Sequence, residues 1–411
     1  MIRKRWRIQP LIRKPLKAKK SSKWLVAMED ELKSMGSNDV WDLVEVPDGA
    51  KKVGCKWVYK TKYDSKGNVE WFKARLVAKG YTQREGIDYK QTFSPVSIKD
   101  SFRIIMVLVA HYDLELHQMD VKTAFLNGDL KGNIYMAQPE GFVVLGKEHL
   151  ACRLKKSIYG LKQASREWYL KFDKIIKTFG FTENIVDNCI YIKFKGSRFT
   201  FLVLYVDDIL LACSDKDTLH ETKNFLSSSF DMKDLGEASY VLGIEIHRDR
   251  SRETLGLSQK AYFERALKKL NMHKCSPSLA PIVKGDKFGT FQYPGNQCET
   301  NQMKSVPYAS AVGSIMYVQV CTRLDLCFCN RDAWQILIKS RTRPLDGRKE
   351  SLRYMQGTKD FMLTYKRTNN LEIVGYSDSD LPGVWIVRDP RQVIYSHSQE
   401  EPYRGKAPNK H

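Results

Sequence analysis

The stretch FLVLYVDDILLAC, residues 201–213, places two adjacent aspartates between two apolar runs. A buried carboxylate without a partner is costly, and two neighbouring carboxylates also repel each other. The apolar residues on both sides are typical of two β-strands, so the segment predicts a tight hairpin with Asp207 and Asp208 at its tip. At such a tip the carboxylates meet either water or a cation.

A third aspartate, Asp120 in HQMDVKTAFL, also stands at the predicted end of a strand. Carboxylates that converge from two strands suit a pair of Mg²⁺ ions, which prefer oxygen ligands and clamp the attacking and leaving oxygens of phosphoryl transfer. Successive residues of a strand point to opposite faces, so only one of Asp207 and Asp208 needs to be a direct ligand unless the turn bends both inward. By itself, however, an Asp-Asp pair at a turn is most often only a turn.

The chain is strongly basic, with a formal net charge of +21 and a pI near 9.4. This charge indicates a polyanionic partner, for which nucleic acid is the commonest candidate and an anionic membrane surface the rival. The apolar fraction of 42% is enough for real cores, and 411 residues allow two or three domains. Composition alone says nothing about catalysis.

Cysteine usage and the N-terminus indicate an intracellular, reducing compartment. Nine cysteines are scattered along the chain without a pair of CxxC motifs, so packing thiols are favoured over a metal site even at the closest cluster, Cys321, Cys327 and Cys329. No apolar run approaches the roughly 20 residues of a membrane span, and no signal peptide is present. The basic residues 1–20 suit a nuclear address, a nucleic-acid arm or a disordered remnant.

Periodicity predicts an alternation of helices and strands. Residues 53–82 predict a β-hairpin that turns at 64–68 and bears many lysines and arginines, which suits either a phosphate backbone or a solvated sheet face. A strand leads into Asp120, a strand followed by a loop is expected at 134–142, a further strand at 240–250, and the beginning of another at 371–380. Helices are expected at 21–36, 97–113, 161–180, 217–230, 257–272 and 306–328.

YVDD, with LHQMDVKTAFLNGDL upstream, resembles the catalytic core of reverse transcriptases, specifically the copia-type class of long-terminal-repeat retrotransposons. GCKWVYKTKYDSKGNVEWFKARLVAKGYTQREGIDY, SIYGLKQASREWY, FDMKDLGEASYVLGIEI and VPYASAVGSIMY resemble further blocks of that Pol polyprotein, in its order. The resemblance extends from about Trp24 to Asp380. It implies an α+β right-hand polymerase with fingers, palm and thumb at 21–275, after a basic disordered arm at 1–20. A linker at 276–305, a helical connection at 306–370 and a truncated ribonuclease H-like remnant and tail at 371–411 are expected to follow.

The same resemblance assigns a catalytic site. Asp120, Asp207 and Asp208 match the palm carboxylates that hold two Mg²⁺ (or Mn²⁺) ions while a primer 3′-hydroxyl attacks the incoming nucleotide. The implied partners are an RNA template, a DNA primer and deoxynucleoside triphosphates. Phe125 matches an aromatic residue beneath the sugar that excludes a 2′-hydroxyl, with a plain core aromatic as the alternative.

Other matched positions concern substrate binding and a second activity. Lys73 and Arg75 match fingertip residues that meet the triphosphate, Gln163 a residue near the 3′ side of the nucleotide, and Leu242 and Gly243 the strand that grips the primer. Asp378 in GYSDSD matches the first ribonuclease H carboxylate. The later residues of that block are not recognisable, so we expect no ribonuclease H activity.

Three hypotheses follow. The leading one is an RNA-directed DNA polymerase fragment, located in the cytoplasm (in a virus-like particle) or the nucleus and translated from a truncated element that lacks the protease and integrase expected upstream. The second is an inactive remnant that binds nucleic acid through its basic surface. The third is a receiver-like signalling module, in which an acidic pair also ends a strand. In a receiver the pair leads into a loop and a helix, whereas here it leads back into ILLAC, which argues against this hypothesis.

Overall fold

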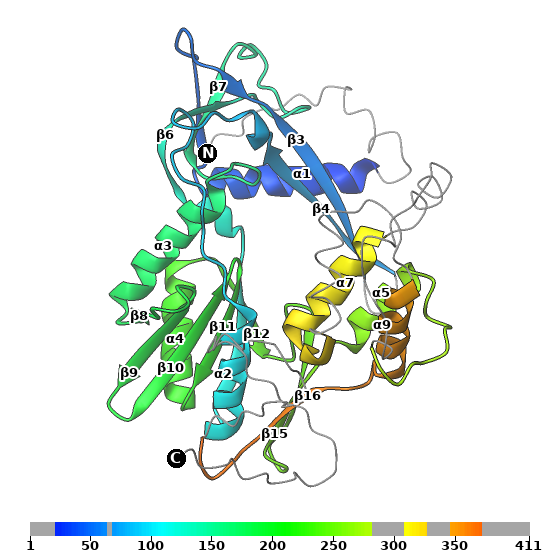
Figure 1. The fold of residues 1–411 in the computed structure, drawn as a ribbon. Coiled ribbons are helices and arrows are strands. Elements are labelled where there is room, and N and C mark those ends of the chain that lie inside the picture. The colour runs from blue at the N-terminus through cyan, green and yellow to red at the C-terminus, as the bar shows by residue number, and fades with distance from the viewer. Residues whose placement is uncertain (1–20, 64–67, 282–307, 327–345, 372–411) are drawn as a thin grey trace, which may run out of the picture. The chain divides into compact units, whose positions relative to one another are not determined.

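The computed structural model describes residues 21–63, 68–281, 308–326 and 346–371 (Figure 1). The chain forms two compact units, each with two chain segments. The first unit comprises Met1–Ile98 and Glu115–Glu237, and the second comprises Lys99–Leu114 and Ala238–His411. Each unit is described by itself below. The division into fingers, palm, thumb and connection stays a prediction.

The first unit is built on a six-stranded antiparallel sheet in the order β12-β5-β11-β10-β9-β8. Its strands are β5 Glu115–Val121, β8 Thr182–Glu183, β9 Ile190–Lys195, β10 Arg198–Tyr205, β11 Asp208–Cys213 and β12 Met232–Glu237. The strand predicted to lead into Asp120 and the hairpin of 201–213 are both confirmed. Its predicted tip was wrong by one residue, because Asp208 already pairs with Tyr205 as the first residue of β11.

Two helices, α3 (Ala164–Thr178) and α4 (Lys216–Ser229), pack on one face of this sheet (Figure 1). Alternate residues of the strands, such as Leu204 and Ile209, point into this core and meet Trp168 and Phe172 of α3. Burial of such side chains contributes roughly 25 cal/mol for each Å² of apolar surface. The opposite face of the sheet presents the other set of alternating side chains.

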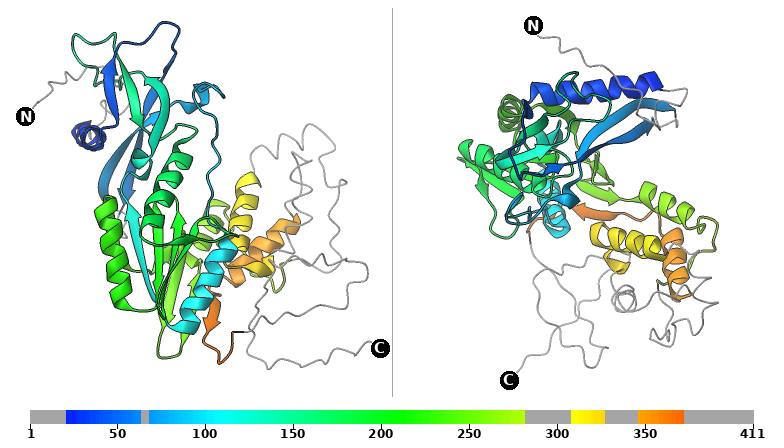
Figure 2. Two further views of the ribbon diagram at one scale, coloured as in Figure 1. Left: turned by 90° about the vertical axis from the view of Figure 1, so that its left-hand side faces the viewer. Right: turned by 90° about the horizontal axis from the view of Figure 1, so that it is seen from above.

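A second group of elements in the first unit surrounds a long hairpin. Helix α1 (Ser21–Ser37) packs along β4 (Val69–Ala78), which pairs with β3 (Cys55–Tyr63), as the view from above shows (Figure 2). The hairpin was predicted from its sequence; its turn at 64–67 lies outside the described residues. A four-stranded sheet lies in the order β1-β7-β6-β2, formed by Trp41–Val44, Ala151–Lys156, Asp129–Met136 and Lys52–Val53. Two short 3₁₀ turns, η1 (Gly80–Thr82) and η2 (Ala124–Asn127), complete the group.

Helix α3 begins at Ala164, several residues later than the expected start after Gly160. Residues 157–163 form a turn instead, in which Gly160 has a φ of +90°. A Cβ on Gly160 would lie 2.2 Å from the carbonyl oxygen of Ala78. Only glycine fits this close approach of two backbones, and its conformation delays the helix.

The second unit contains helix α2 (Lys99–Tyr112) and a sheet in the order β13-β14-β15-β16. The strands are Tyr240–Val241, Ile244–Asp249, Thr254–Ser258 and Leu363–Lys366. Helices α5 (Lys260–Lys269), α7 (Tyr308–Cys321) and α9 (Asp346–Gly357) and the turn η4 (Leu324–Leu326) share a small apolar core. The guanidinium of Arg323 is buried beside it and is bonded to Asp325 and to Thr358.

One expected strand proved to be two. Residues 240–250 were predicted as a single strand, but Val241 pairs with Ile244 across a two-residue turn. Both turn residues, Leu242 and Gly243, have positive φ angles, +54° and +75°. This is the pattern of a type I′ turn, which matches the twist of a hairpin. Gly243 was the available signal, since a glycine inside a strand pattern often marks such a bend.

Several expectations lie outside the described residues: the basic arm at 1–20, most of the linker at 276–305, Cys327 and Cys329, and the strand at 372–380. Within the described ranges, no helix is long and apolar enough to cross a membrane.

Candidate active site

The turn between β10 and β11 contains Val206 and Asp207, because Tyr205 and Asp208 are the last residues paired across the hairpin. Val206 has a φ of +60°, a conformation that is costly for a β-branched residue. The buried indole of Trp168 donates a hydrogen bond from Nε1 to the Val206 carbonyl at 2.6 Å. Packing from α3 therefore holds the tip of the hairpin in a strained shape.

Asp120 lies directly opposite Asp208 in the pairing of β5 with β11. The next residue of β5, Val121, donates its backbone N–H to the Asp207 carbonyl at 2.9 Å. All three aspartates are thus gathered where β5 meets the hairpin tip. By strand alternation, Asp120 and Asp208 lie on the sheet face opposite to the one that α3 and α4 cover.

Gln118 orients one of these carboxylates. It stands two residues before Asp120 on β5, is 7% exposed, and donates from Nε2 to Asp208 Oδ1 at 3.0 Å. Because the amide is buried, it has few other positions available. Asp208 is therefore held by a fixed donor on the neighbouring strand.

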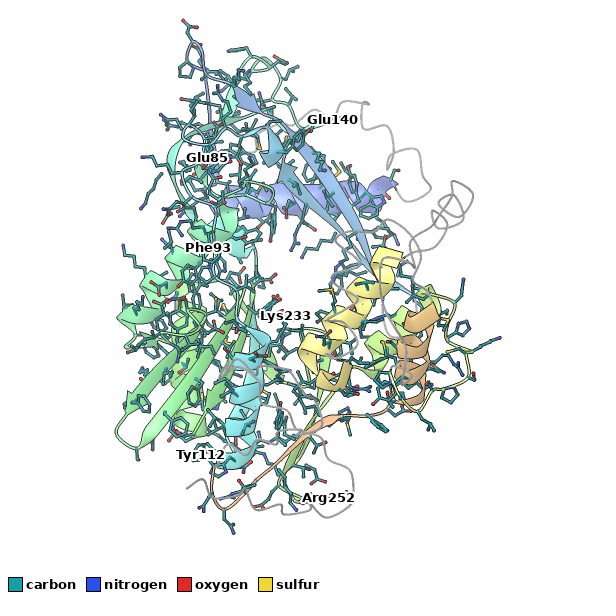
Figure 3. All side chains as sticks on the ribbon, viewed as in Figure 1. Glu85, Phe93, Tyr112, Glu140, Lys233 and Arg252 are labelled. Carbon is teal, nitrogen blue, oxygen red and sulfur yellow. The ribbon has the colours of Figure 1, made fainter. Side chains whose placement is uncertain are left out.

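The aspartates share an unfavourable electrostatic environment. Burial raises the pKa of Asp120, and the negative charge of Asp207 raises it further, while Lys73, Lys233 and Arg75 lower it. Burial likewise raises the pKa of Asp208, opposed by the Gln118 hydrogen bond. Among the opposing cations, Lys233 is the cross-strand neighbour of Asp120 on β12 and is labelled in Figure 3.

The donors suit a hard divalent cation in their chemistry. Mg²⁺ and Mn²⁺ prefer carboxylate oxygens, and a cation would offset the burial and the smaller mutual repulsion that raise the pKa of Asp120 and Asp208. Among the residues that the structure describes, no three His, Cys, Asp or Glu side chains converge closely enough to define a metal site. Asp208 is already engaged by Gln118, and the assignment of Asp120, Asp207 and Asp208 as metal ligands stays a prediction.

The two predicted fingertip cations lie on β4 and face the same cluster. Burial lowers the pKa of Lys73, as does the neighbouring Arg75, whereas Glu31 and Asp120 raise it. Glu31 on α1 is 8% exposed and accepts a hydrogen bond from the Leu76 backbone N–H at 3.3 Å. The buried carboxylate of Glu31 therefore interacts with Lys73 and Arg75, the same cations that lower the pKa of Asp120.

Phe125 lies on η2, half-buried between two apolar clusters. Its ring contacts that of Tyr159, with centroids 5.1 Å apart and planes inclined by 59°. The guanidinium of Arg75 lies over the same Tyr159 ring, 4.3 Å from its centroid. Tyr159 therefore links the predicted sugar contact to the predicted triphosphate contact.

Gln163 is 5% exposed, and both ends of its amide are engaged. Its Oε1 accepts from Gln83 Nε2 at 3.1 Å, and its Nε2 donates to the Asp88 carbonyl at 3.0 Å. Gln163 also lines a pocket of about 420 Å³ with Arg166 and Lys131. The contacts observed at Gln163 are structural, and its role toward a nucleotide stays a prediction.

The remaining predicted residues lie outside the first unit or outside the described residues. Leu242 and Gly243 belong to the second unit, where Tyr317 bonds the Leu242 carbonyl. Asp378 lies outside the described residues. Their roles toward a primer and in ribonuclease H chemistry stay predictions.

Four residues of the cluster were not singled out from the sequence: Gln118, Glu31, Lys233 and Tyr159. A signal existed for two of them. Gln118 precedes Asp120 by two positions, which places it on the same strand face. Glu31 stands on the apolar face of its helix, between Met28 and Met35.

Aspartates cluster at the ends of two neighbouring strands, β5 and β11, and cations on a nearby hairpin oppose their charge. This arrangement is suited to phosphoryl transfer. The sequence profile of the family described as reverse transcriptase (RNA-dependent DNA polymerase) matches residues 38–284, more than half of the chain. The chain belongs to this family.

Individual relatives agree. The chain is 44% identical over 358 residues to the "Retrovirus-related Pol polyprotein from transposon TNT 1-94" of Nicotiana tabacum, covering 87% of this chain and 27% of that protein. It is 36% identical over 372 residues to the corresponding polyprotein from transposon RE1 of Arabidopsis thaliana, covering 90% and 25%. A "Transposon Ty1-DR1 Gag-Pol polyprotein" of Saccharomyces cerevisiae is 27% identical over 372 residues, covering 85% and 20%.

The predicted resemblance to copia-type Pol polyproteins is thereby confirmed. The chain spans about a quarter of the length of the first two relatives.

Proposed function

We propose that this chain is an RNA-directed DNA polymerase that extends a DNA primer on an RNA template. One observation supports this more than any other: Asp120 and Asp208 are cross-strand partners beside Asp207. Burial and the charge of Asp207 raise the pKa of Asp120, and the nearby cations Lys73 and Arg75 lower it. Family membership adds the reaction class. The net charge of +21 suits a duplex whose backbones need neutralisation.

In this proposal Asp120 and Asp207 would hold divalent cations, and Asp208 would complete their environment while Gln118 keeps it in place. Two bound Mg²⁺ or Mn²⁺ ions would supply charge neutralisation at the attacking and leaving oxygens. Arg75 offers a forked donor, and Lys73 a point charge, for the triphosphate of the incoming nucleotide. Rate enhancement would then come mainly from positioning and preorganised charge.

Phe125 would act at the sugar. An aromatic face beneath the ribose leaves no room for a 2′-hydroxyl, so deoxynucleotides are preferred. The retrotransposon relationship implies that the enzyme works in a cytoplasmic particle or in the nucleus. We propose no ribonuclease H activity for this chain, because its sequence does not continue the expected block beyond Asp380.

The test is primer extension on poly(rA)–oligo(dT) with Mg²⁺ or Mn²⁺, comparing the parent with Asp207→Asn. Asp217→Asn is the matched control, because Asp217 lies on α4 with its side chain 84% exposed. Extension by the parent and by Asp217→Asn, but not by Asp207→Asn, supports the proposal. If all three bind the duplex and none extends it, the chain is a nucleic-acid-binding remnant.

A further inference from the structure

The predicted triphosphate contact and the predicted sugar contact are joined through one aromatic ring. The Arg75 guanidinium lies 4.3 Å from the Tyr159 ring centroid, and the Phe125 ring centroid lies 5.1 Å from the same ring. Arg75 and Phe125 come from different elements, β4 and η2, and are 50 positions apart in the chain. Tyr159 is therefore placed to fix both at once.

The backbone around Tyr159 is tied to the same two elements. The Tyr159 carbonyl accepts a hydrogen bond from the Ala78 N–H at 2.7 Å, at the end of the strand that bears Arg75. Two residues earlier, the Ser157 N–H donates to the Gly128 carbonyl at 2.8 Å, immediately after the turn that bears Phe125. The turn that holds Tyr159 is thus bonded to both of its ring partners' elements.

Close packing leaves this turn little freedom. A Cβ on Gly80 would lie 2.0 Å from the Gly160 carbonyl oxygen, and one on Gly160 would lie 2.2 Å from the Ala78 carbonyl oxygen. Buried contacts of this kind transmit displacement, because protein interiors are close-packed. The Tyr159 phenol is neutral at physiological pH, and its ring face is a platform for a guanidinium.

We infer that Tyr159 is a positioning residue that sets nucleotide affinity through Arg75 and sugar selectivity through Phe125. This inference rests on the proposed polymerase function. A ring at position 159 holds the guanidinium over its face and limits how far Phe125 tilts away from the sugar. A side chain without a ring loosens both partners and leaves the aspartates in place.

The test measures kcat and KM for dTTP and for UTP in primer extension by the parent, Tyr159→Phe and Tyr159→Leu. Tyr159→Phe keeps the ring, and we expect values within about twofold of the parent. For Tyr159→Leu we expect KM for dTTP to rise about 5- to 10-fold with little change in kcat, as for the loss of a contact made equally in the ground and transition states. We also expect the preference for dTTP over UTP to fall about 10-fold, a change that altered affinity for the triphosphate alone does not produce.

A double-mutant cycle with Phe125→Ala shows whether Tyr159 acts on the sugar through Phe125. In the Phe125→Ala background, Tyr159→Leu is expected to leave the dTTP-to-UTP preference unchanged while still raising KM. Tyr159→Met, a flexible apolar residue without a ring, serves as the second variant if Tyr159→Leu does not fold.

The outcomes separate the inference from the function on which it rests. If the parent does not extend the primer, the polymerase proposal itself fails. If the parent is active and the ringless variants, folded by thermal melting, keep both its KM and its sugar preference, the inference about Tyr159 is overturned. Equal losses in Tyr159→Phe and Tyr159→Leu would also overturn it, because the ring would not be the part that matters.

Discussion

Asp120 and Asp208 face each other as cross-strand partners, and the Gln118 side chain, two residues before Asp120, holds the second of them with a hydrogen bond of 3.0 Å. The pair places two carboxylates on one sheet face, with a third, Asp207, in the adjoining turn. Their mutual repulsion is a cost to the folded chain that a bound cation would offset.

Removing one charge should therefore stabilise the fold and abolish the proposed activity. Asp120→Asn is expected to raise the free energy of unfolding by up to about 1 kcal/mol in EDTA. The pKa of Asp120 is raised in the folded protein, so its contribution to stability is full below the ordinary value of 3.8 and is lost as the pH rises through the folded value. The gain in Asp120→Asn should consequently be larger at neutral than at acidic pH, as measured by urea unfolding.

Divalent metal should reverse the order of stability of the parent and Asp120→Asn. Millimolar Mg²⁺ is expected to raise the melting temperature of the parent and to leave that of Asp120→Asn nearly unchanged. An equal shift in both proteins would place the metal elsewhere.

The strained turn supplies a second prediction. Val206 has a φ of +60°, which glycine adopts freely, so Val206→Gly should be neutral or stabilising by up to about 1 kcal/mol. Val58→Gly is the matched control, because Val58 lies in β3 with 43% of its surface exposed. There the same substitution should cost about 1 kcal/mol. Equal costs in denaturant unfolding would mean that the turn stores no strain.

The close contact at Gly160 is testable against a glycine in open space. Gly86 has a similar φ of +80°, but a Cβ there would meet no atom within 4 Å. Gly86→Ala should cost about 1 kcal/mol from backbone conformation alone, whereas Gly160→Ala should cost at least about 2 kcal/mol more, because Ala78 must move. Similar losses in the two variants, measured by chemical unfolding, would contradict the close approach.

Lys223 connects helix α4 to the edge of the sheet. It is 8% exposed, donates to both oxygens of Asp234 at 2.9 and 2.8 Å, and lies 2.9 Å from His117 Nδ1. Burial lowers the pKa of His117 and Lys223 lowers it further, against the opposing charges of Asp234, Glu115 and Glu237. Lys223→Met should destabilise the fold by about 1–2 kcal/mol, since Asp234 is itself half-exposed. Lys216→Met, at an exposed position on the same helix, is the control.

The destabilisation caused by Lys223→Met should be larger at neutral than at acidic pH. Although burial raises the pKa of Asp234, hydrogen bonds from Lys223 and from the Gly236 N–H lower it overall. Its contribution to stability is therefore present above the ordinary value of 3.8 and is lost as the pH falls through the folded value. Unfolding curves of the parent and Lys223→Met should converge in acid; a constant difference would exclude this pair as the cause.

The contribution of Glu31 to stability should depend on pH in the opposite direction to that of Asp234. Burial raises its pKa more than Leu76, Arg75 and Lys73 lower it, so its contribution is full below 4.5 and is lost as the pH rises. Glu31→Gln keeps an acceptor for the Leu76 N–H and removes the charge, and should stabilise the protein at neutral pH relative to Glu29→Gln on the exposed side of the same helix. A destabilised Glu31→Gln would show that its charge pairing with Lys73 and Arg75 outweighs burial.

Much of this site could be predicted from sequence because its key features are local. Asp207 and Asp208 interrupt an apolar run, which leaves a turn as the only inexpensive solution, and Asp120 ends another strand. The hydrogen bond from Gln118 could not be foreseen, because it depends on the register of β5 against β11. Tyr159 gave no signal either, since its partners belong to elements far away in the chain. The bend at Leu242 was missed because its neighbours fit a strand pattern.

Helix α2 belongs to the second unit, although the residues on both sides of it belong to the first. Arg103 of this helix donates to the Val320 carbonyl, and Arg248 reaches the carbonyl of Leu114 just beyond it. A ribosome therefore makes α2 well before the strands and helices on which it packs. More than one hundred further residues must be synthesised before the packing partners of its buried side chains are available. These side chains include Phe102, Ile105, Met106 and Val109. No single cut of the chain separates the two units, and a shortened chain that ends at Glu237 would expose this apolar helix without its partners.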